Sequence, residues 1–279
     1  MNSNKIVNIA GYRFIDLHDH DELRQPFLVA CKELELKGTI LLSPNGINFS
    51  LAGEQEAINS FIEFLESDNR FIGIPIKITH NDYQPFRRML VRLKKEIIAL
   101  GMDEIRPIDF TGPKIKPTEF KEILDNEEEV IVLDTRNDYE TRVGLFKNAV
   151  DLNLATFRDF PKAIKELPDE YKKKPIVMYC TGGIRCEKAS AVMLKEGFEN
   201  VKQLEGGILG YFKETDGSYW EGDCFVFDDR VAVDTELKET EYVMCFACRE
   251  PLTTEEINSP SYKIGEHCPY CIEKSRDIK

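Results

Sequence analysis

The chain has 279 residues, of which 42% are hydrophobic and 31% charged, and its net charge is -13. This composition is typical of a soluble globular protein, and the length predicts two or three domains. The acidic balance argues against broad, sequence-independent nucleic-acid binding but leaves room for a local basic patch. No apolar stretch is as long as a membrane span and no signal peptide is evident, so we expect a cytoplasmic protein without a membrane partner.

The first segment, residues 1–100, alternates strand and helix patterns. The expected elements are a strand at 5–16, a helix at 21–36, two strands within 38–53, a helix at 55–65 and a strand at 74–80. Apolar residues at helical spacing and a turn at Pro44-Asn45-Gly46 support this reading. The order β-α-β-β-α-β predicts a ferredoxin-like α+β domain, a fold that names no function.

A basic cluster closes this segment within nine positions: Arg87, Arg88, Arg92, Lys94 and Lys95. A charge run of this kind is commonly a solvated strand or helix face. In a chain this acidic, the basic cluster is also the best candidate for contacts with the phosphates of RNA.

Residues 101–117 are rich in glycine and proline, and we expect a linker there. The next segment, 118–215, carries short apolar runs at 130–134 and 175–180, which are typical of strands buried on both faces. Helix-like stretches alternate with these runs. The pattern predicts a parallel sheet covered on both sides.

The stretch YCTGGIRCEKAS, residues 179–190, lies where one of these apolar strands ends. Cys180 ends the strand, and a helix is expected to begin near Glu187, so the residues between them form the turn. Ligands of open α/β sheets bind at this edge. Gly182 and Gly183 let several amide groups converge on an anion, and Arg185 adds positive charge. This setting lowers a thiol pKa and favours a reactive thiolate, although a tight turn around an inert cysteine is the simpler alternative.

The length of this loop separates two kinds of enzyme. Four residues, Thr181, Gly182, Gly183 and Ile184, lie between Cys180 and Arg185. Cysteine-dependent phosphatases enclose a phosphate with a loop that is one residue longer. The shorter ring fits a single sulfur atom better than a tetrahedral phosphate, so the spacing favours sulfur chemistry.

The last segment, 216–279, is rich in loops and carries two Cys-x-x-Cys pairs, Cys245 with Cys248 and Cys268 with Cys271. Nineteen residues separate the pairs, a spacing that predicts a structural Zn²⁺ site. Four free thiols or two disulfides are the alternative, and a reducing cytosol disfavours the disulfides. A bound metal would supply much of the folding free energy of so small a module.

Several motifs of the chain resemble the rhodanese domain. They are the loop of residues 180–186, which we call the thiol loop, the Asp-x-Arg element Asp134-Thr135-Arg136, the acidic residue Glu140 and the closing Glu205-Gly206-Gly207. The family's Gly-His-Ile element is matched by Gly144-Leu145-Phe146 only at the glycine. The resemblance implies that Cys180 is the reactive cysteine. We expect Asp134, Arg136 and Glu140 to hold neighbouring loops by ion pairs.

The CTGGIRCEKAS loop, together with the first and last segments, is similar to the bacterial tRNA uridine hydroxylases of the rhodanese superfamily. That resemblance implies a tRNA-modifying oxidoreductase that uses molecular oxygen to convert the wobble uridine, position 34, into 5-hydroxyuridine, with an electron donor still to be identified. One alternative is a sulfurtransferase that carries a persulfide on Cys180. Another is an RNA-binding scaffold with an inactive rhodanese domain, which the intact thiol loop disfavours.

Cys186 follows Cys180 by six positions and has two interpretations. It could be a resolving thiol in a redox cycle, or a residue packed in the first helical turn, which is the more common situation. The predicted architecture is thus α/β, with a ferredoxin-like domain, a rhodanese-like domain and a small zinc module.

Overall fold

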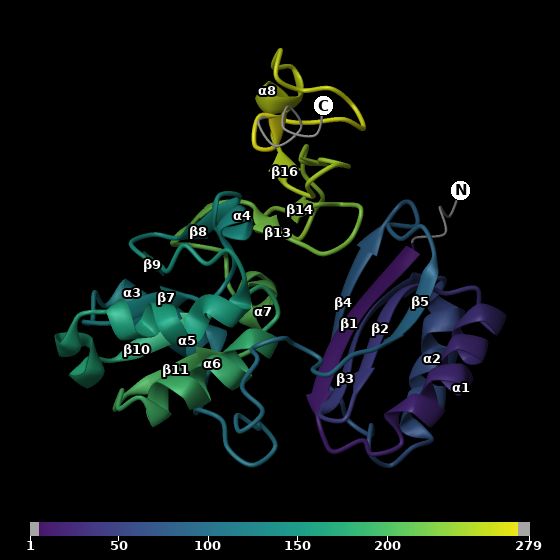
Figure 1. Ribbon diagram of the computed structural model, residues 1–279, viewed down its shortest axis with the longest axis horizontal. Helices are drawn as coiled ribbons and strands as arrows, with labels where there is room; N and C mark the ends of the chain where they lie inside the picture. Colours follow the sequence, from purple (N-terminus) through teal and green to yellow (C-terminus); the bar gives the residue numbers. More distant parts are fainter. Residues whose placement is uncertain (1–5, 273–279) are drawn as a thin grey trace. The chain divides into compact units, whose positions relative to one another are not determined.

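The computed structural model describes residues 6–272. Its backbone contacts divide the chain into two compact units, 1–111 and 112–279 (Figure 1). Among the helices of the described residues, none combines the length and the apolar character needed to cross a bilayer.

The first unit is a five-stranded sheet in the order β4-β1-β3-β2-β5. Its strands are β1 (Ile6–Phe14), β2 (Lys37–Ser43), β3 (Gly46–Gly53), β4 (Ile76–Asn81) and β5 (Met89–Leu93), and its helices are α1 (His20–Glu33) and α2 (Gln55–Glu66). Strands β1 to β4 and the two helices follow the β-α-β-β-α-β order, so the expected ferredoxin-like domain is confirmed.

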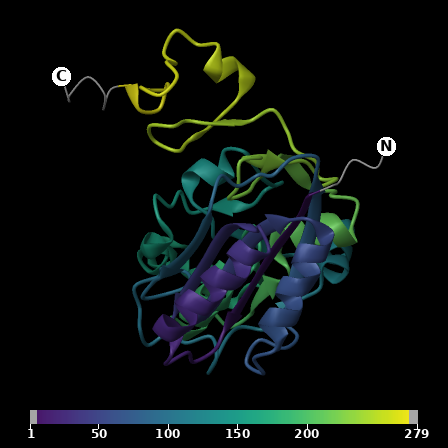
Figure 2. The ribbon, with the colours of Figure 1, turned by 90° about the vertical axis from the view of Figure 1, so that its right-hand side faces the viewer.

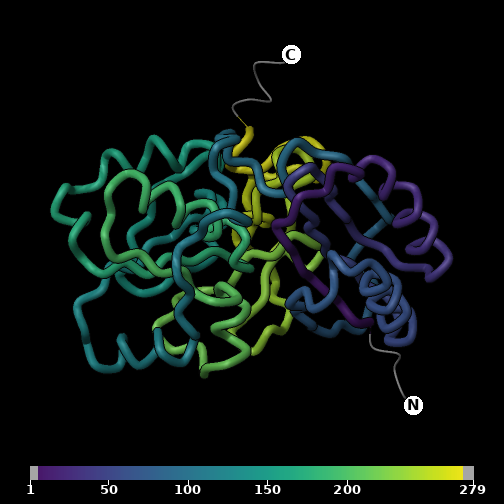
Figure 3. Tube along the Cα trace, turned by 90° about the horizontal axis from the view of Figure 1, so that it is seen from below, coloured from purple at the N-terminus to yellow at the C-terminus, as the bar shows by residue number. Residues whose placement is uncertain are grey.

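Helices α1 and α2 lie side by side over one face of this sheet (Figures 2 and 3). Three phenylalanines join the two layers. Phe61 of α2 packs edge-to-face on Phe27 of α1 and on Phe49 of β3, with ring centroids 6.5 and 5.8 Å apart. All three are buried, so this face of the sheet holds the core of the unit.

Strand β5 is a fifth strand that the sequence pattern did not predict. It lies parallel to β2, with Gly38 opposite Met89 and Leu42 opposite Leu93. Val91 points into the core, whereas its neighbour Arg92 is exposed. Of the basic cluster, Arg92 therefore lies in an edge strand and the other four residues flank that strand. Charged side chains at such an edge discourage pairing with another chain.

The second unit contains a parallel sheet in the order β6-β11-β10-β7-β9. Its strands are β6 (Lys114–Ile115), β7 (Ile131–Asp134), β9 (Val150–Asp151), β10 (Ile176–Tyr179) and β11 (Val201–Leu204). Its helices include α3 (Pro117–Asp125), α4 (Asp138–Thr141), α5 (Phe160–Ala163), α6 (Ile184–Lys195) and α7 (Gly207–Glu214), and the 3-10 turns η1 (Phe157–Asp159), η2 (Ile164–Glu166) and η3 (Asp169–Lys173) precede β10. The expected parallel α/β domain is confirmed.

Strand β10 lies in the middle of this sheet, and all four of its residues are buried. Tyr179 belongs to the same apolar cluster as Phe120 of α3 and Tyr211 of α7. Helix α6 packs against β10 and β11 and contacts α5. Because β10 is enclosed in this way, its carboxyl end delivers Cys180 to the sheet edge in a fixed position.

The chain after residue 216 begins by packing on the parallel sheet. Strand β12 (Trp220–Gly222) pairs with β8 (Gly144–Phe146), and β13 (Cys224–Phe225) pairs with β14 (Ala232–Val233). Trp220 and Cys224 lie in the apolar cluster of the sheet. A last hairpin is formed by β15 (Val243–Met244) and β16 (Pro251–Leu252), and α8 (Thr254–Ile257) follows it. The first cysteine pair lies in the loop of this hairpin, and the second pair follows α8. The domain boundaries at 100, 117 and 215 stay predictions.

Candidate active site

Cys180 lies between the end of β10 and the start of α6 and is fully buried. Its Sγ accepts a hydrogen bond from the amide of Gly183 at 3.1 Å. Gly183 is the N-cap of α6 and has φ +96°, a backbone conformation that favours glycine. The sulfur thus occupies the expected anion nest at a helix N-terminus.

The surroundings of Cys180 favour its thiolate. Burial opposes the charged form, but a hydrogen bond from Cys186, the charge of Arg185 and the amides of Arg185 and Gly183 outweigh it, and the Cys180 pKa falls to about 5. Burial and the neighbouring Cys180 sulfur raise the pKa of Cys186 well above its usual value. The pair therefore holds one anionic and one protonated sulfur, and the protonated one also lies 3.7 Å from Thr135 Oγ1.

Arg185 forms a bidentate ion pair with Glu140 of α4. Its two terminal nitrogens lie 2.5 and 2.6 Å from Glu140 Oε1 and Oε2, and both side chains are buried. Thr181 Oγ1 donates to Glu140 Oε2 at 3.3 Å. Glu140 therefore anchors the thiol loop at two points. Its carboxylate also offsets part of the positive charge that Arg185 presents to the sulfur.

A second buried ion pair joins Arg136 to Asp134 at the end of β7. Arg136 Nη2 lies 2.7 Å from Asp134 Oδ2 and donates at 2.6 Å to the carbonyl of Gly144. Its guanidinium carbon is 5.2 Å from the ring centroid of Trp220. This pair ties the end of β7 to β8 and β12.

The first residue of α7 closes the thiol loop from the other side. The amides of Ile208 and Leu209 donate to the carbonyls of Cys180 and Thr181 at 3.0 and 3.1 Å. A Cβ on Gly207, which has φ +64°, would lie 2.3 Å from the carbonyl oxygen of Cys180. The closing Glu-Gly-Gly of the rhodanese pattern thus has a steric role that the sequence did not reveal.

An aromatic segment that was not predicted from the sequence borders the thiol loop. Thr181 Oγ1 lies within 3.5 Å of the carbonyl oxygen of Phe225, at the end of β13. The ring of Phe227 packs against Phe225 and lies 5.9 Å from the guanidinium carbon of Arg185. The aromatic-rich run WEGDCFVF at 220–227 is the signal that could have indicated it.

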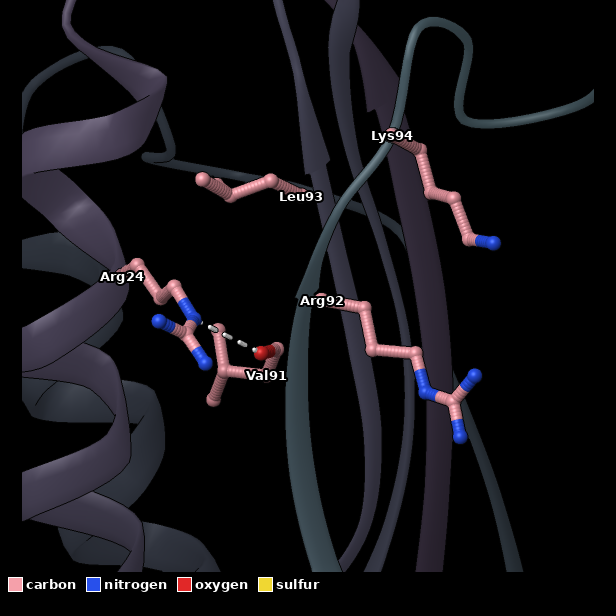
Figure 4. Close-up of a pocket in the computed structure, with 5 residues that line it drawn as sticks. All are labelled: Arg24, Val91, Arg92, Leu93 and Lys94. Carbon is pink, nitrogen blue, oxygen red and sulfur yellow. Dashed lines mark hydrogen bonds between the residues drawn. The ribbon is translucent and has the colours of Figure 1, made fainter.

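The basic cluster belongs to the first unit, and its five side chains are exposed. A shallow hollow of about 430 Å³ lies beside β5 and is lined by Arg24, Val91, Arg92, Leu93 and Lys94. Arg24 of α1 donates to the Val91 carbonyl at 3.2 Å, whereas Arg92 and Lys94 point to the other side of the strand (Figure 4). Arg24 therefore lies on the helix side of β5, and Arg92 and Lys94 lie on the other side.

The four paired cysteines converge on one point. The Sγ atoms of Cys245, Cys248, Cys268 and Cys271 all lie within 4.8 Å of one another. Cys268 Sγ lies 3.5 Å from Cys248 Sγ and 3.7 Å from Cys271 Sγ. A tetrahedral zinc with Zn–S bonds of about 2.3 Å separates its sulfurs by about 3.8 Å. The donor set and its spacing therefore fit a metal ion, and the distances are too long for disulfides.

Arg142, next to α4, connects the segment of the cysteine cluster to the parallel α/β domain. It forms an ion pair with Glu250, and its guanidinium carbon lies 4.3 Å from the ring centroid of Tyr270, between two of the cysteines. Glu140 lies two positions earlier and binds Arg185. Helix α4 and the residue after it therefore contact both the thiol loop and residues that neighbour the cysteine cluster.

Comparisons with known proteins cover nearly the whole chain. The UPF0176 acylphosphatase-like domain matches residues 6–97, and the rhodanese-like domain matches residues 116–214. The tRNA uridine(34) hydroxylase of Cupriavidus pinatubonensis is 47% identical over 273 residues, which are 96% of this chain and 97% of that protein. The relative of the same name from Ralstonia nicotianae is 46% identical over 274 residues, with the same coverage of 96% and 97%.

Among solved structures, the rhodanese-like domain of an Anabaena protein is 23% identical, covers 39% of this chain and 79% of its own, and has a TM-score of 0.33. The curated relatives confirm the resemblance expected from the thiol loop and do not favour the sulfurtransferase alternative. The chain belongs to the tRNA uridine(34) hydroxylase family.

Proposed function

We propose that this protein is a tRNA-modifying enzyme that hydroxylates C5 of the wobble uridine, position 34, to give 5-hydroxyuridine. The observation that carries the proposal is the identity of 47% over 96% of the chain with a protein named tRNA uridine(34) hydroxylase. We further propose molecular oxygen as the co-substrate, tRNA as the partner and the cytoplasm as the location.

Cys180 is the proposed catalytic residue. The other loop residues, Thr181, Gly182, Gly183, Ile184, Arg185 and Cys186, shape its surroundings, and Asp134, Arg136 and Glu140 support them. The lowered pKa of Cys180 favours the thiolate, which is the nucleophilic and oxidisable form of the side chain. Its sulfur is fully buried, so the thiolate is held away from bulk solvent.

The proposed metal is Zn²⁺, held by the four convergent cysteine thiolates. A tetrahedral site of four sulfurs has no open position for a substrate, so the role of the metal is structural. Its contribution is to fold residues 243–272 and to hold Glu250 and Tyr270 where they meet Arg142.

The basic cluster is the proposed RNA contact. Its five exposed cations lie in or next to the edge strand β5, in a chain whose net charge is -13, so they are a local exception to the overall charge. Phosphate contacts of this kind orient an RNA without reading its bases.

The direct test combines purified protein, unmodified tRNA, air and a chemical reductant, followed by nucleoside mass spectrometry. We expect 5-hydroxyuridine with the wild type and none with Cys180→Ser. Omitting oxygen should remove the product as well. Efficient transfer of sulfur from thiosulfate to cyanide, without any change in the tRNA, would instead support the sulfurtransferase.

A further inference from the structure

Phe227 is an exposed aromatic residue at the edge of the thiol loop. Its side chain is 59% exposed, one of the largest values among the large hydrophobic residues that the structure describes. Single exposed apolar residues are common on protein surfaces, so exposure alone assigns this ring no role. Its place beside the thiol loop is what distinguishes it from the other exposed rings. The backbone that holds this ring and the residues around it indicate which kind of ligand it suits.

The loop that carries Phe227 is held rigidly. Val226 donates to the carbonyl of Val231 at 2.8 Å and thereby closes the hairpin between β13 and β14. Asp228 and Arg230 form a buried ion pair within the turn, at 2.5 Å. The ring is therefore presented by a fixed backbone, so a ligand that stacks on it meets a preorganised surface.

Two contacts attach this hairpin to the thiol loop. Phe225 accepts from Thr181, the residue after Cys180, and the guanidinium of Arg185 lies 5.9 Å from the Phe227 ring. Arg185 also faces Glu140, which fixes its position. The Phe227 ring thus lies next to the cation that borders Cys180, and much of its surface remains open.

From this geometry we infer that Phe227 is the stacking platform for the uracil ring of the substrate nucleotide. The inference rests on the proposed function and identifies a positioning residue for it. Enzymes that modify a base take it out of its stack, and aromatic side chains commonly receive the exposed face of such a base. A stack on Phe227 would hold the pyrimidine beside the thiol loop while the phosphates are bound elsewhere.

The first test compares four proteins on an anticodon stem-loop RNA under multiple turnover. Stacking of one base on an aromatic ring is worth about 5- to 150-fold in affinity. We therefore expect Phe227→Ala to raise KM by at least about fivefold, Phe227→Leu to behave like it, and Phe227→Trp to retain near wild-type kinetics. Leucine keeps the apolar bulk of phenylalanine but has no aromatic face. Phe227→Leu therefore separates the loss of base stacking from the loss of apolar packing.

The control is Phe110→Ala, which removes a ring of similar exposure, 56%, in the other unit. Its kinetics and the melting temperatures of all variants should match the wild type. A Phe227→Leu protein with wild-type kinetics would overturn the inference, and so would a Phe227→Ala protein within twofold of the wild type.

The second test does not depend on turnover. The chain has one tryptophan, Trp220, which is buried, so the Trp in Phe227→Trp is a distinct fluorescent reporter. We expect RNA with uridine at position 34 to quench it more strongly than RNA that is abasic there. Equal quenching by both RNAs would overturn the stacking inference. Selective quenching without any 5-hydroxyuridine would refute the proposed reaction and leave the stacking contact standing.

Discussion

Glu140 and Arg185 form a bidentate ion pair in which the arginine is 6% exposed and the glutamate not at all. The arginine belongs to the first turn of α6, beside the reactive sulfur, and the glutamate belongs to α4. Breaking a buried pair leaves one uncompensated charge in the protein interior, at a cost of about 3–5 kcal/mol.

Glu140→Gln should therefore lower the free energy of unfolding by several kcal/mol and disturb the loop around Cys180. Urea denaturation measures the first effect. Asp169→Asn is the control, because its ion pair with Lys172 is exposed and such pairs are worth about 0–1 kcal/mol. A Glu140→Gln protein as stable as Asp169→Asn would show that the pair adds little.

The titration of Cys180 offers a second prediction. Its pKa of about 5 lies below the ordinary thiol value, so the thiolate persists from high pH down to about pH 5 and is protonated below it. Ultraviolet absorbance of the thiolate, taken as the difference from Cys180→Ser, should show this midpoint. Because the pKa of Cys180 is lower in the folded protein than in the unfolded chain, its thiolate stabilises the fold. This contribution to the free energy of unfolding is complete above about pH 9 and is lost as the pH falls toward 5.

Cys31→Ser is the control for that titration, because burial raises the Cys31 pKa to about 12 and its thiol stays protonated across this range. Removing Cys31 should leave the absorbance step unchanged. A step near the ordinary thiol pKa in the wild type would contradict the proposed anion nest.

Gly207→Ala tests the contact that closes the thiol loop. The new Cβ would meet the Cys180 carbonyl at 2.3 Å, so the loop must move. We expect a clear loss of stability and a Cys180 titration shifted toward ordinary values. Gly197→Ala is the matched control, because Gly197 also has positive φ but open space around it. Its left-handed strain alone costs about 1 kcal/mol, and its thiol titration should be unchanged.

Metal removal should affect one part of the chain selectively. Cys268→Ser removes one of the four converging sulfurs, and we expect the protein to lose its single equivalent of zinc. Hydrogen exchange should then rise over residues 243–272, because a metal of this kind supplies the folding free energy of its module. Protein that retains full zinc content after Cys268→Ser would refute a four-sulfur site.

The basic cluster predicts a salt-dependent affinity for tRNA. Arg92→Glu should weaken binding, and the slope of log affinity against log salt should fall by about 0.7–0.9 for each lost phosphate contact. Lys32→Glu makes the same charge change at an exposed position of α1. If both variants bind equally well, the basic cluster is only a solvated strand edge.

The sequence predicted the strand, the glycine turn and the helix around Cys180, because these patterns are encoded within a few residues. The expected helix start near Glu187 was wrong, since α6 begins at Ile184 and Arg185 lies in its first turn. It could not predict that Glu140 binds Arg185, since that pairing depends on how α4 and α6 meet in space. Strand β5 escaped prediction for a related reason. Its exposed Arg92 and Lys94 obscure the apolar alternation, and its pairing with β2 is a long-range contact. The roles of the site residues stay predictions.

The contact between Gly207 and Cys180 also has a consequence for the order of folding. The amides that fix the carbonyls of Cys180 and Thr181 come from α7, which the ribosome releases after the thiol loop and after β11. A nascent chain that ends before α7 lacks the donors for these two carbonyls. The carbonyls of the thiol loop are therefore fixed only after all five strands of the parallel sheet have been synthesised.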